Sequence, residues 1–143
     1  ILVKINLIKE SEENSMSSIN DLNKQIAKLY FEKISFKKNK IKQTFCYIED
    51  CSDISIDQIK ILSDVVKANH KDSISVLLKH SKDIINCYVG VSKQCKHSYN
   101  AKQIIGELSK KFKSKGGGSP TFATSVIPNQ DAKTVIDYLN KIL

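Results

Sequence analysis

Hydrophobic residues recur at three- and four-residue steps along much of the chain, and this spacing is typical of amphipathic helices. The longest such stretch runs from residue 19 to residue 34 and carries Ile19, Leu22, Ile26, Leu29, Tyr30, Phe31 and Ile34. We expect this helix to end near Lys38-Asn39. Its apolar stripe fits packing on the rest of the domain, a helical hairpin or a dimer seam, and the sequence does not decide among them.

The chain opens with an apolar stretch over residues 1–8, followed by a polar stretch over residues 11–18. The first has too many apolar positions for a free tail, so we expect it to continue a helix or strand from an upstream segment. The second is expected to be a loop or a weak helix. Because the chain starts with Ile1 and its only Met is Met16, we expect it to be a piece of a longer protein.

Beyond residue 40, short apolar runs alternate with helical patterns. Strands are predicted over 41–48, 73–78, 84–91 and 122–127, an acidic turn over 49–53, and helices over about 55–69, 99–112 and 131–143. The turn at 81–83 makes the second and third strands a hairpin. Ser55 or Asp53 can cap the first of these helices, and Asp131 the last.

The predicted order is therefore α-β-α-β-β-α-β-α, which indicates an α/β (α+β) fold. An N-terminal helix precedes a mixed β-sheet that is covered by helices. We place the boundary near residue 39, between a helical segment over 1–39, for linkage or dimerisation, and a globular domain over 40–143.

Charge narrows the choice of partners. The net charge is +8, and all 23 basic residues are Lys. Lysines neutralise phosphates and release counterions, which favours a polyanionic partner, although codon bias in an AT-rich genome also produces Lys-rich proteins. Without Arg, bidentate contacts to guanine are absent. Any nucleic acid should therefore be recognised by shape and backbone.

The sequence offers no catalytic or metal centre. Cys46, Cys51, Cys87 and Cys95 lack the paired spacing of zinc sites, and Cys95 with His97 has no second pair. We expect reduced thiols in a cytoplasmic protein, because signal-peptide and membrane-length apolar segments are missing. We also expect no bound cofactor.

The sharpest local signal is a run of three glycines, Gly116, Gly117 and Gly118, between Lys115 and Ser119. Glycine lets backbone amides approach a phosphate closely, and the lysines just before the run, including Lys113, supply positive charge. The segment differs from a Walker loop because Ser119-Pro120 replaces the required Lys-Ser or Lys-Thr. The alternative interpretation is a flexible turn between a helix and a strand.

A second signal is the strand Val89-Gly-Val-Ser-Lys93, followed by Gln94-Cys-Lys-His97. Gly90 inside a strand indicates a bulge or a close backbone approach. Lys93, Lys96 and their polar neighbours would project from the end of this strand. They could bind an anion or simply form a basic loop that faces water.

Taken together and in this order, these segments resemble the C-terminal domain of alanyl-tRNA synthetases, a domain shared with DHH-type phosphoesterases. The resemblance covers residues 20 to 143: a strand like 89–93, the helix 101–112, Lys115-Gly-Gly-Gly-Ser-Pro120, Ala123 and a closing helix over 131–143. This sequence departs from the family pattern at Ser119, Thr121, Thr124 and Val126. Those departures bear on how a phosphate would be contacted.

The resemblance implies a non-catalytic domain that binds the elbow of an alanine-specific tRNA and couples aminoacylation with editing. It implies nucleic-acid contacts from Lys93, Lys96, Lys113, Lys115, Gly116, Gly117, Gly118 and Ser119. The parent would be an ATP-dependent alanine–tRNA ligase whose ATP, magnesium and zinc belong to upstream domains. It also implies a homodimer through the N-terminal helix.

Two alternatives stay open. One is the substrate-binding domain of a DHH-type phosphoesterase or nuclease, whose upstream part would carry an Asp-His-His motif. The other is a dimerisation module with an incidental basic face.

Overall fold

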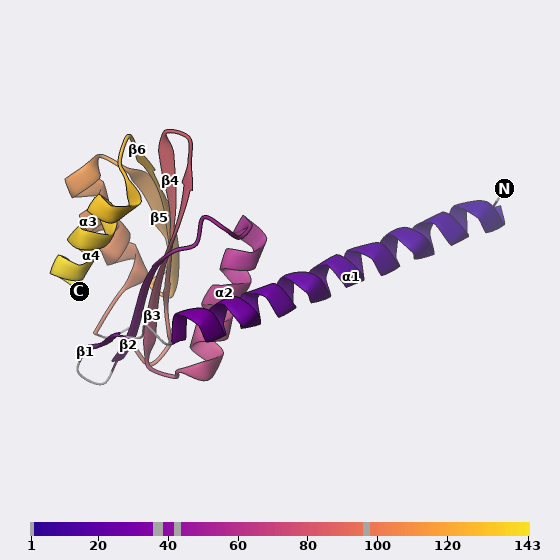
Figure 1. Ribbon diagram of the computed structural model, residues 1–143, viewed down its shortest axis with the longest axis horizontal. Coiled ribbons are helices and arrows are strands. Elements are labelled where there is room, and N and C mark those ends of the chain that lie inside the picture. The colour runs from indigo at the N-terminus through magenta and orange to yellow at the C-terminus, as the bar shows by residue number, and fades with distance from the viewer. Residues whose placement is uncertain (1, 36–38, 42–43, 96–97) are drawn as a thin grey trace.

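The fold is built on a six-stranded mixed sheet with the strand order β1-β2-β3-β4-β6-β5 (Figure 1). The computed structural model describes residues 2–35, 39–41, 44–95 and 98–143. Strands β2 and β3 are parallel and all other neighbours are antiparallel. The elements are α1 (Leu2–Ser35), β1 (Asn39–Ile41), β2 (Thr44–Asp50), α2 (Ile56–Asn69), β3 (Ser73–Ser81), β4 (Ile84–Val91), α3 (Ala101–Phe112), β5 (Lys115–Gly118), β6 (Phe122–Pro128) and α4 (Ala132–Ile142).

Most of the predicted elements are confirmed, including the α/β class and the β3–β4 hairpin. The polar stretch 11–18, expected to be a loop or a weak helix, is helical and lies within α1. Four details differ. Helix α1 ends at Ser35, so that Asn39 already begins β1. The strand predicted over 41–48 is divided between β1 and β2, with 42–43 outside the described residues. Glu49 and Asp50 belong to β2 because they pair with Leu77 and Leu78 of β3. Lys115–Gly118 forms β5 instead of a turn.

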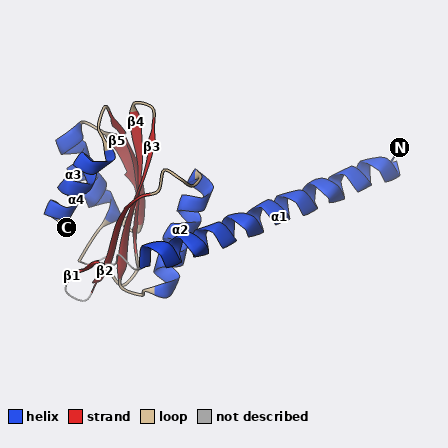
Figure 2. Ribbon diagram, viewed as in Figure 1, coloured by secondary structure: helices blue, strands red, loops and turns tan. Residues whose placement is uncertain are grey.

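Helices cover the two faces of the sheet, and each face has its own apolar core (Figure 2). Alternation along β3 divides the residues between them: Ile74, Val76 and Leu78 face α3 and α4, whereas Leu77 faces α2 and the end of α1. Both sets are fully buried. The hydrophobic effect of these two cores therefore sets which way each strand residue points.

Local side-chain bonds fix the N-terminal ends of three helices, and the caps of α2 and α4 were predicted from the sequence. Ser55 caps α2 in a capping box with Gln58, whose side chain accepts from the Ser55 amide at 2.9 Å. Asp131 caps α4 by accepting from the Thr134 amide at 2.7 Å. Asn100 caps α3 in the same way, by accepting from Lys102 and Gln103.

The apolar residues of α1 are buried near one end of the helix and exposed along the rest. Near its C-terminal end, Ala27 and Ile34 are buried in the core beside α2, and the Tyr30 hydroxyl donates to the Asp50 carbonyl oxygen at 3.0 Å. The rest of the helix extends away from the sheet (Figure 1). There, Ile19 and Leu22 are each 56% exposed, and Leu29, on the outer face of the packed end, is 65% exposed. In the described part of the chain, no helix combines the length and the apolarity needed to cross a bilayer.

Candidate nucleic-acid interface

The three glycines lie in β5, the strand at one edge of the sheet, where every residue from Lys115 to Gly118 is exposed. The alternative interpretation of these glycines as a flexible turn is therefore wrong. Pairing with β6 brings Lys115 opposite Val126 and Gly117 opposite Thr124. The glycines form a strand because of a long-range interaction. Strand β6 lies beside them and offers main-chain hydrogen bonds, and nothing within the glycine run itself indicates this partner.

Close packing explains why two of the three positions require glycine. A Cβ at Gly116 would overlap the Thr124 carbonyl oxygen and lie 2.7 Å from the Ser125 Cα. A Cβ at Gly118, where φ is +154°, would overlap the Phe122 carbonyl oxygen. At Gly117, in contrast, an added Cβ would have open space around it. Glycine at 116 and 118 therefore lets β5 sit against β6.

The same pairing leaves main-chain groups free at the edge. The Ser119 amide donates to the Phe122 carbonyl oxygen at 2.9 Å, which marks a hydrogen-bonded pair. Bonded and non-bonded pairs alternate along an antiparallel ladder, so the pairs of Gly118 and Gly116 are non-bonded. Their N–H and C=O groups consequently point away from β6, toward the open side of β5. Backbone amides without covering side chains are suitable donors to a phosphate.

Ser119 closes the turn between β5 and β6. Its hydroxyl accepts from the Phe122 amide at 3.2 Å and lies 3.3 Å from the Thr121 hydroxyl. Both hydroxyls stand at positions where the sequence departs from the family pattern. Ser119 is exposed, but its first role in this structure is to hold the turn.

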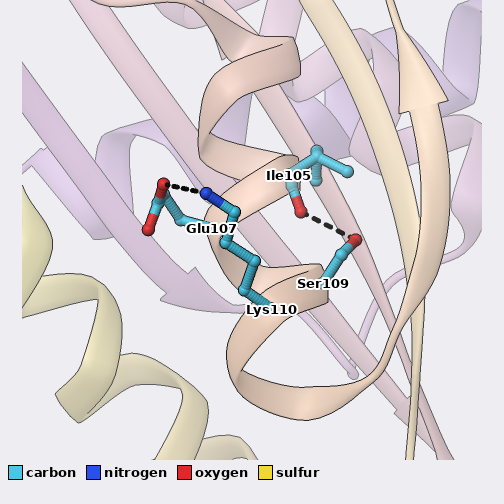
Figure 3. Close-up of polar contacts among 4 residues, drawn as sticks. All are labelled: Ile105, Glu107, Ser109 and Lys110. Carbon is cyan, nitrogen blue, oxygen red and sulfur yellow. Dashed lines mark hydrogen bonds and ion pairs between the residues drawn. The ribbon is translucent and has the colours of Figure 1, made fainter.

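The lysines before the glycine run differ in how free they are. Lys113 is the C-cap of α3 with φ 53°, and Lys115 is the first residue of β5; both are exposed. Lys110, one turn earlier, is paired with Glu107 at 3.5 Å (Figure 3). In the same turn, the Ser109 hydroxyl donates to the Ile105 carbonyl oxygen at 3.0 Å. Lys113 and Lys115 are therefore better placed than Lys110 to meet an anion.

The second sequence signal lies at the carboxyl end of β4. Gly90 causes a close approach and not a bulge, because β4 pairs without interruption with β3 and β6 on its two sides. A Cβ there would overlap the Ser63 hydroxyl of α2 and lie 3.3 Å from the Lys67 Cε. Lys93 follows the strand and is exposed, whereas Lys96 and His97 lie outside the described residues.

Only part of the predicted set comes together. The Val91 amide donates to the Thr121 carbonyl oxygen at 2.8 Å, so the end of β4 lies beside the Ser119–Phe122 turn. Lys93 and Ser119 thus share one end of the sheet. Lys115 lies at the other end of β5, three residues from Gly118, or roughly 10 Å in an extended strand. The candidate site is therefore elongated along this edge of the sheet and not compact.

One face of this edge can be assigned. Phe122 packs in the core on the α2 side of the sheet, and alternation along β6 puts Thr124 and Val126 on that side. Their partners Gly117 and Lys115 share it. We call these five residues, Phe122, Thr124, Val126, Lys115 and Gly117, the β5–β6 strip. Because α2 packs on β3 and β4, Val126 remains 43% exposed.

Two further lysines, in α2 and in the turn after it, belong to this end of the sheet and were not predicted from the sequence. The Lys67 ammonium donates to the Thr121 carbonyl oxygen at 3.2 Å and lies 5.8 Å from the centre of the Phe122 ring. Lys71 lies nearby and lines the same hollow as Lys93. A topological signal was available: when a helix leads into β3 and β4 returns antiparallel, the C-terminus of that helix lies beside the end of β4.

The described residues contain no group of three or more His, Cys, Asp or Glu side chains arranged to hold a metal ion. All four cysteines are buried and free, and burial raises the pKa of the Cys46 thiol to about 11. Burial also lowers the pKa of Lys67, although the Asp64 carboxylate opposes that shift. The arrangement suits binding of an anion by lysines and amides.

Residues 33–143 match the DHHA1 domain family. An alanine–tRNA ligase from Fervidobacterium nodosum is 34% identical over 127 residues, covering 86% of this chain and 14% of the relative. The crystal structure of the C-Ala domain from the Aquifex aeolicus alanyl-tRNA synthetase shares the fold, with a TM-score of 0.64 and 23% identity over 73% of this chain and 94% of that one. A DHH domain described as a member of the s1p family of ribosomal proteins matches with a TM-score of 0.56 and 16% identity over 82% of this chain and 30% of that one. This chain thus spans about one seventh of the ligase that it matches.

Proposed function

Because this chain belongs to the DHHA1 domain family, we propose that it is the non-catalytic C-terminal domain of an alanyl-tRNA synthetase and that it binds the elbow of tRNA. In the parent protein, this contact couples aminoacylation with editing. ATP, magnesium and zinc serve the upstream domains. The observation that carries the proposal is β5: an exposed edge strand of glycines that begins at Lys115 and runs toward the end of the sheet where Lys93 follows β4.

The chemistry of this edge of the sheet, which includes the β5–β6 strip, fits a folded RNA. Double-stranded and folded RNA is recognised mainly through shape, phosphates and 2′-hydroxyls. The free amides of Gly116 and Gly118 offer donors to backbone oxygens, and Lys115 and Lys93 add charge at the two ends. The chain has no Arg for bidentate base reading. Binding should therefore depend on shape and salt and only weakly on base sequence.

Reversing the charge of Lys93 and Lys115 tests this function. The variant Lys93→Glu/Lys115→Glu is expected to bind alanine tRNA at least about tenfold more weakly, because two phosphate contacts become repulsive. The dissociation constant is measured by fluorescence anisotropy over a series of salt concentrations. The intact chain should show a steep loss of affinity with salt, and the variant a shallower one.

A matched control is Lys133→Glu/Lys141→Glu, which makes the same charge change on α4, on the other side of the sheet. It should leave tRNA affinity within about twofold, since exposed charges further than a Debye length of about 8–10 Å are largely screened. If both variants lost tRNA affinity equally, binding would depend on the net charge of the domain and not on the positions of Lys93 and Lys115. An unchanged affinity in the Lys93/Lys115 variant would remove the strip from the binding surface.

A second role, dimerisation through α1, rests on the exposed stripe of that helix. Ile19, Leu22, Ile26 and Leu29 follow one another at steps of three, four and three residues, which is the a/d spacing of a coiled coil. The buried positions Ala27 and Ile34 lie on an adjacent face and pack on the domain. A second copy of α1 is the partner whose stripe has the same spacing, and we propose that it covers these residues.

Aspartates on the stripe should therefore separate the dimer. The variant Ile19→Asp/Leu22→Asp is expected to sediment as a monomer at concentrations where the unchanged chain is dimeric, because it would place charges in an apolar seam. The control Asn20→Asp/Lys24→Asp puts two aspartates on other faces of the same helix and should stay dimeric. Analytical ultracentrifugation across concentration distinguishes the two. A monomeric unchanged chain would contradict the seam.

The fold shared with a DHH domain keeps one alternative in view, the substrate-binding domain of a DHH-type phosphoesterase. In that role, the glycine strand would hold a small nucleotide or a single-stranded end instead of a folded tRNA. Competition separates these roles. Short oligonucleotides displace the tRNA at comparable concentration under the alternative, and fail to do so under the proposed function.

A further inference from the structure

A basic hollow lies where the C-terminal turn of α2 meets the end of β4. It has a volume of about 320 Å³ and is lined by Lys67, Lys71, Ser92, Lys93 and Gln94. The lining residues come from two segments that β3 and β4 separate in the chain. The Ser92 amide holds the two segments together by donating to the carbonyl oxygen of Ser73, two residues after Lys71, at 3.0 Å. The three lysines therefore line one hollow because of the tertiary fold.

Lys67 is held in place before any ligand arrives. Its stem passes over Gly90, where an added Cβ would lie 3.3 Å from the Lys67 Cε. Its ammonium donates one hydrogen bond to the Thr121 carbonyl oxygen at 3.2 Å and has two further N–H groups that can donate to a ligand. A cation that is already ordered loses less side-chain entropy on binding than a free surface lysine does.

Among the described residues that line the hollow, none carries a negative charge. The lining residues are three lysines, one serine and one glutamine. The ion pair found among the described residues joins Lys110 to Glu107 on α3 and involves none of these lysines. The Asp64 carboxylate acts on Lys67 from outside the hollow. Three cations in one hollow repel one another, and an anion bound between them would relieve that repulsion.

We propose that Lys67, Lys71 and Lys93 form a subsite for a single phosphate group. This rests on the proposed function in one respect: the phosphate is a phosphodiester of the tRNA strand that continues across the β5–β6 strip. The geometry supports that path, because Lys67 lies against Phe122, the first residue of the strip. The RNA strand would then pass from the hollow over Phe122 and Thr124 toward Lys115.

Inorganic pyrophosphate tests the subsite without RNA. Titrated into the ¹⁵N-labelled chain, it should shift the amide resonances of Ser92, Lys93 and Gln94 in a saturable way. In Lys71→Gln/Lys93→Gln, two exposed positions, the apparent affinity should fall about tenfold or more. The control Lys133→Gln/Lys141→Gln on α4 should bind as the unchanged chain does. Absent or non-saturating shifts, or equal affinity in Lys71→Gln/Lys93→Gln, would overturn the proposal.

Alanine tRNA then identifies the source of the phosphate. Each lost phosphate contact should reduce the slope of log affinity against log salt by about 0.7 to 0.9, so Lys71→Gln/Lys93→Gln should show a shallower slope than the control. An unchanged slope, with pyrophosphate binding weakened, would overturn the RNA assignment and leave a site for free phosphate. Pyrophosphate binding by a chain that ignores tRNA would instead sink the proposed function and leave the subsite intact.

Discussion

An alanine at position 90 should lower the free energy of unfolding by about 1 to 3 kcal/mol, the usual cost of overpacking a well-packed site. Gly90 faces α2 across a gap with no room for a methyl group. The added Cβ would overlap the Ser63 hydroxyl and lie 2.9 Å from the Ser75 hydroxyl, two groups that are hydrogen-bonded to each other at 3.2 Å. Moving either hydroxyl would leave a buried polar group without its partner.

Urea unfolding of Gly90→Ala measures this cost, and Gly106→Ala provides the control. Gly106 lies within α3, and a Cβ there would meet nothing within 4 Å. Alanine in a helix is favoured over glycine by about 0.8 to 1 kcal/mol, so this variant should be slightly more stable than the unchanged chain. Opposite signs for the two substitutions are expected. A Gly90→Ala variant as stable as the unchanged chain would show that α2 can move away from β4.

The second large effect is expected at Gly116. In Gly116→Ala, the new methyl group would meet backbone atoms of Thr124 and Ser125, which cannot rotate away as a side chain can. Strand β5 should therefore separate from β6, at a cost of about 1 to 3 kcal/mol. Amide hydrogen exchange should show loss of protection at Gly117, whose amide faces β6. Under the proposed function, tRNA affinity should fall as well.

Gly117→Ala is the matched control, since it changes the same residue type one position along and meets open space. Its free energy of unfolding should stay within about 0.5 kcal/mol of the unchanged chain, as for most surface substitutions. The different effects of alanine at positions 116 and 117 would then come from packing against β6, since both variants lose one glycine. If both variants lost hydrogen-exchange protection equally, the effect would come from the flexibility of glycine. The close approach of β5 to β6 would then not be the reason for glycine at position 116.

The helices were predicted from the sequence most completely, because their signals are local. The apolar spacing of α2 and its N-terminal cap are set by residues within one or two turns of each other, so the helix and the cap at Ser55 were correctly predicted. The cap at Asp131 and the β3–β4 hairpin are local in the same sense. The family was also recognisable, because the order of segments from 89 to 143 survives the changes at Ser119 and Thr121.

Tertiary structure determined how the basic groups are distributed. Glycines and lysines could be counted in the sequence, but the pairing of Gly116 with Ser125 depends on which strand lies beside β5. The reach of Lys67 to Thr121 across Gly90 joins residues that are 54 positions apart. Sequence by itself determined the periodicity, the caps and the charge, because these depend on near neighbours. The strip, the hollow and the free face of α1 followed from strand order and packing, because those bring together residues that have no local relation in the chain.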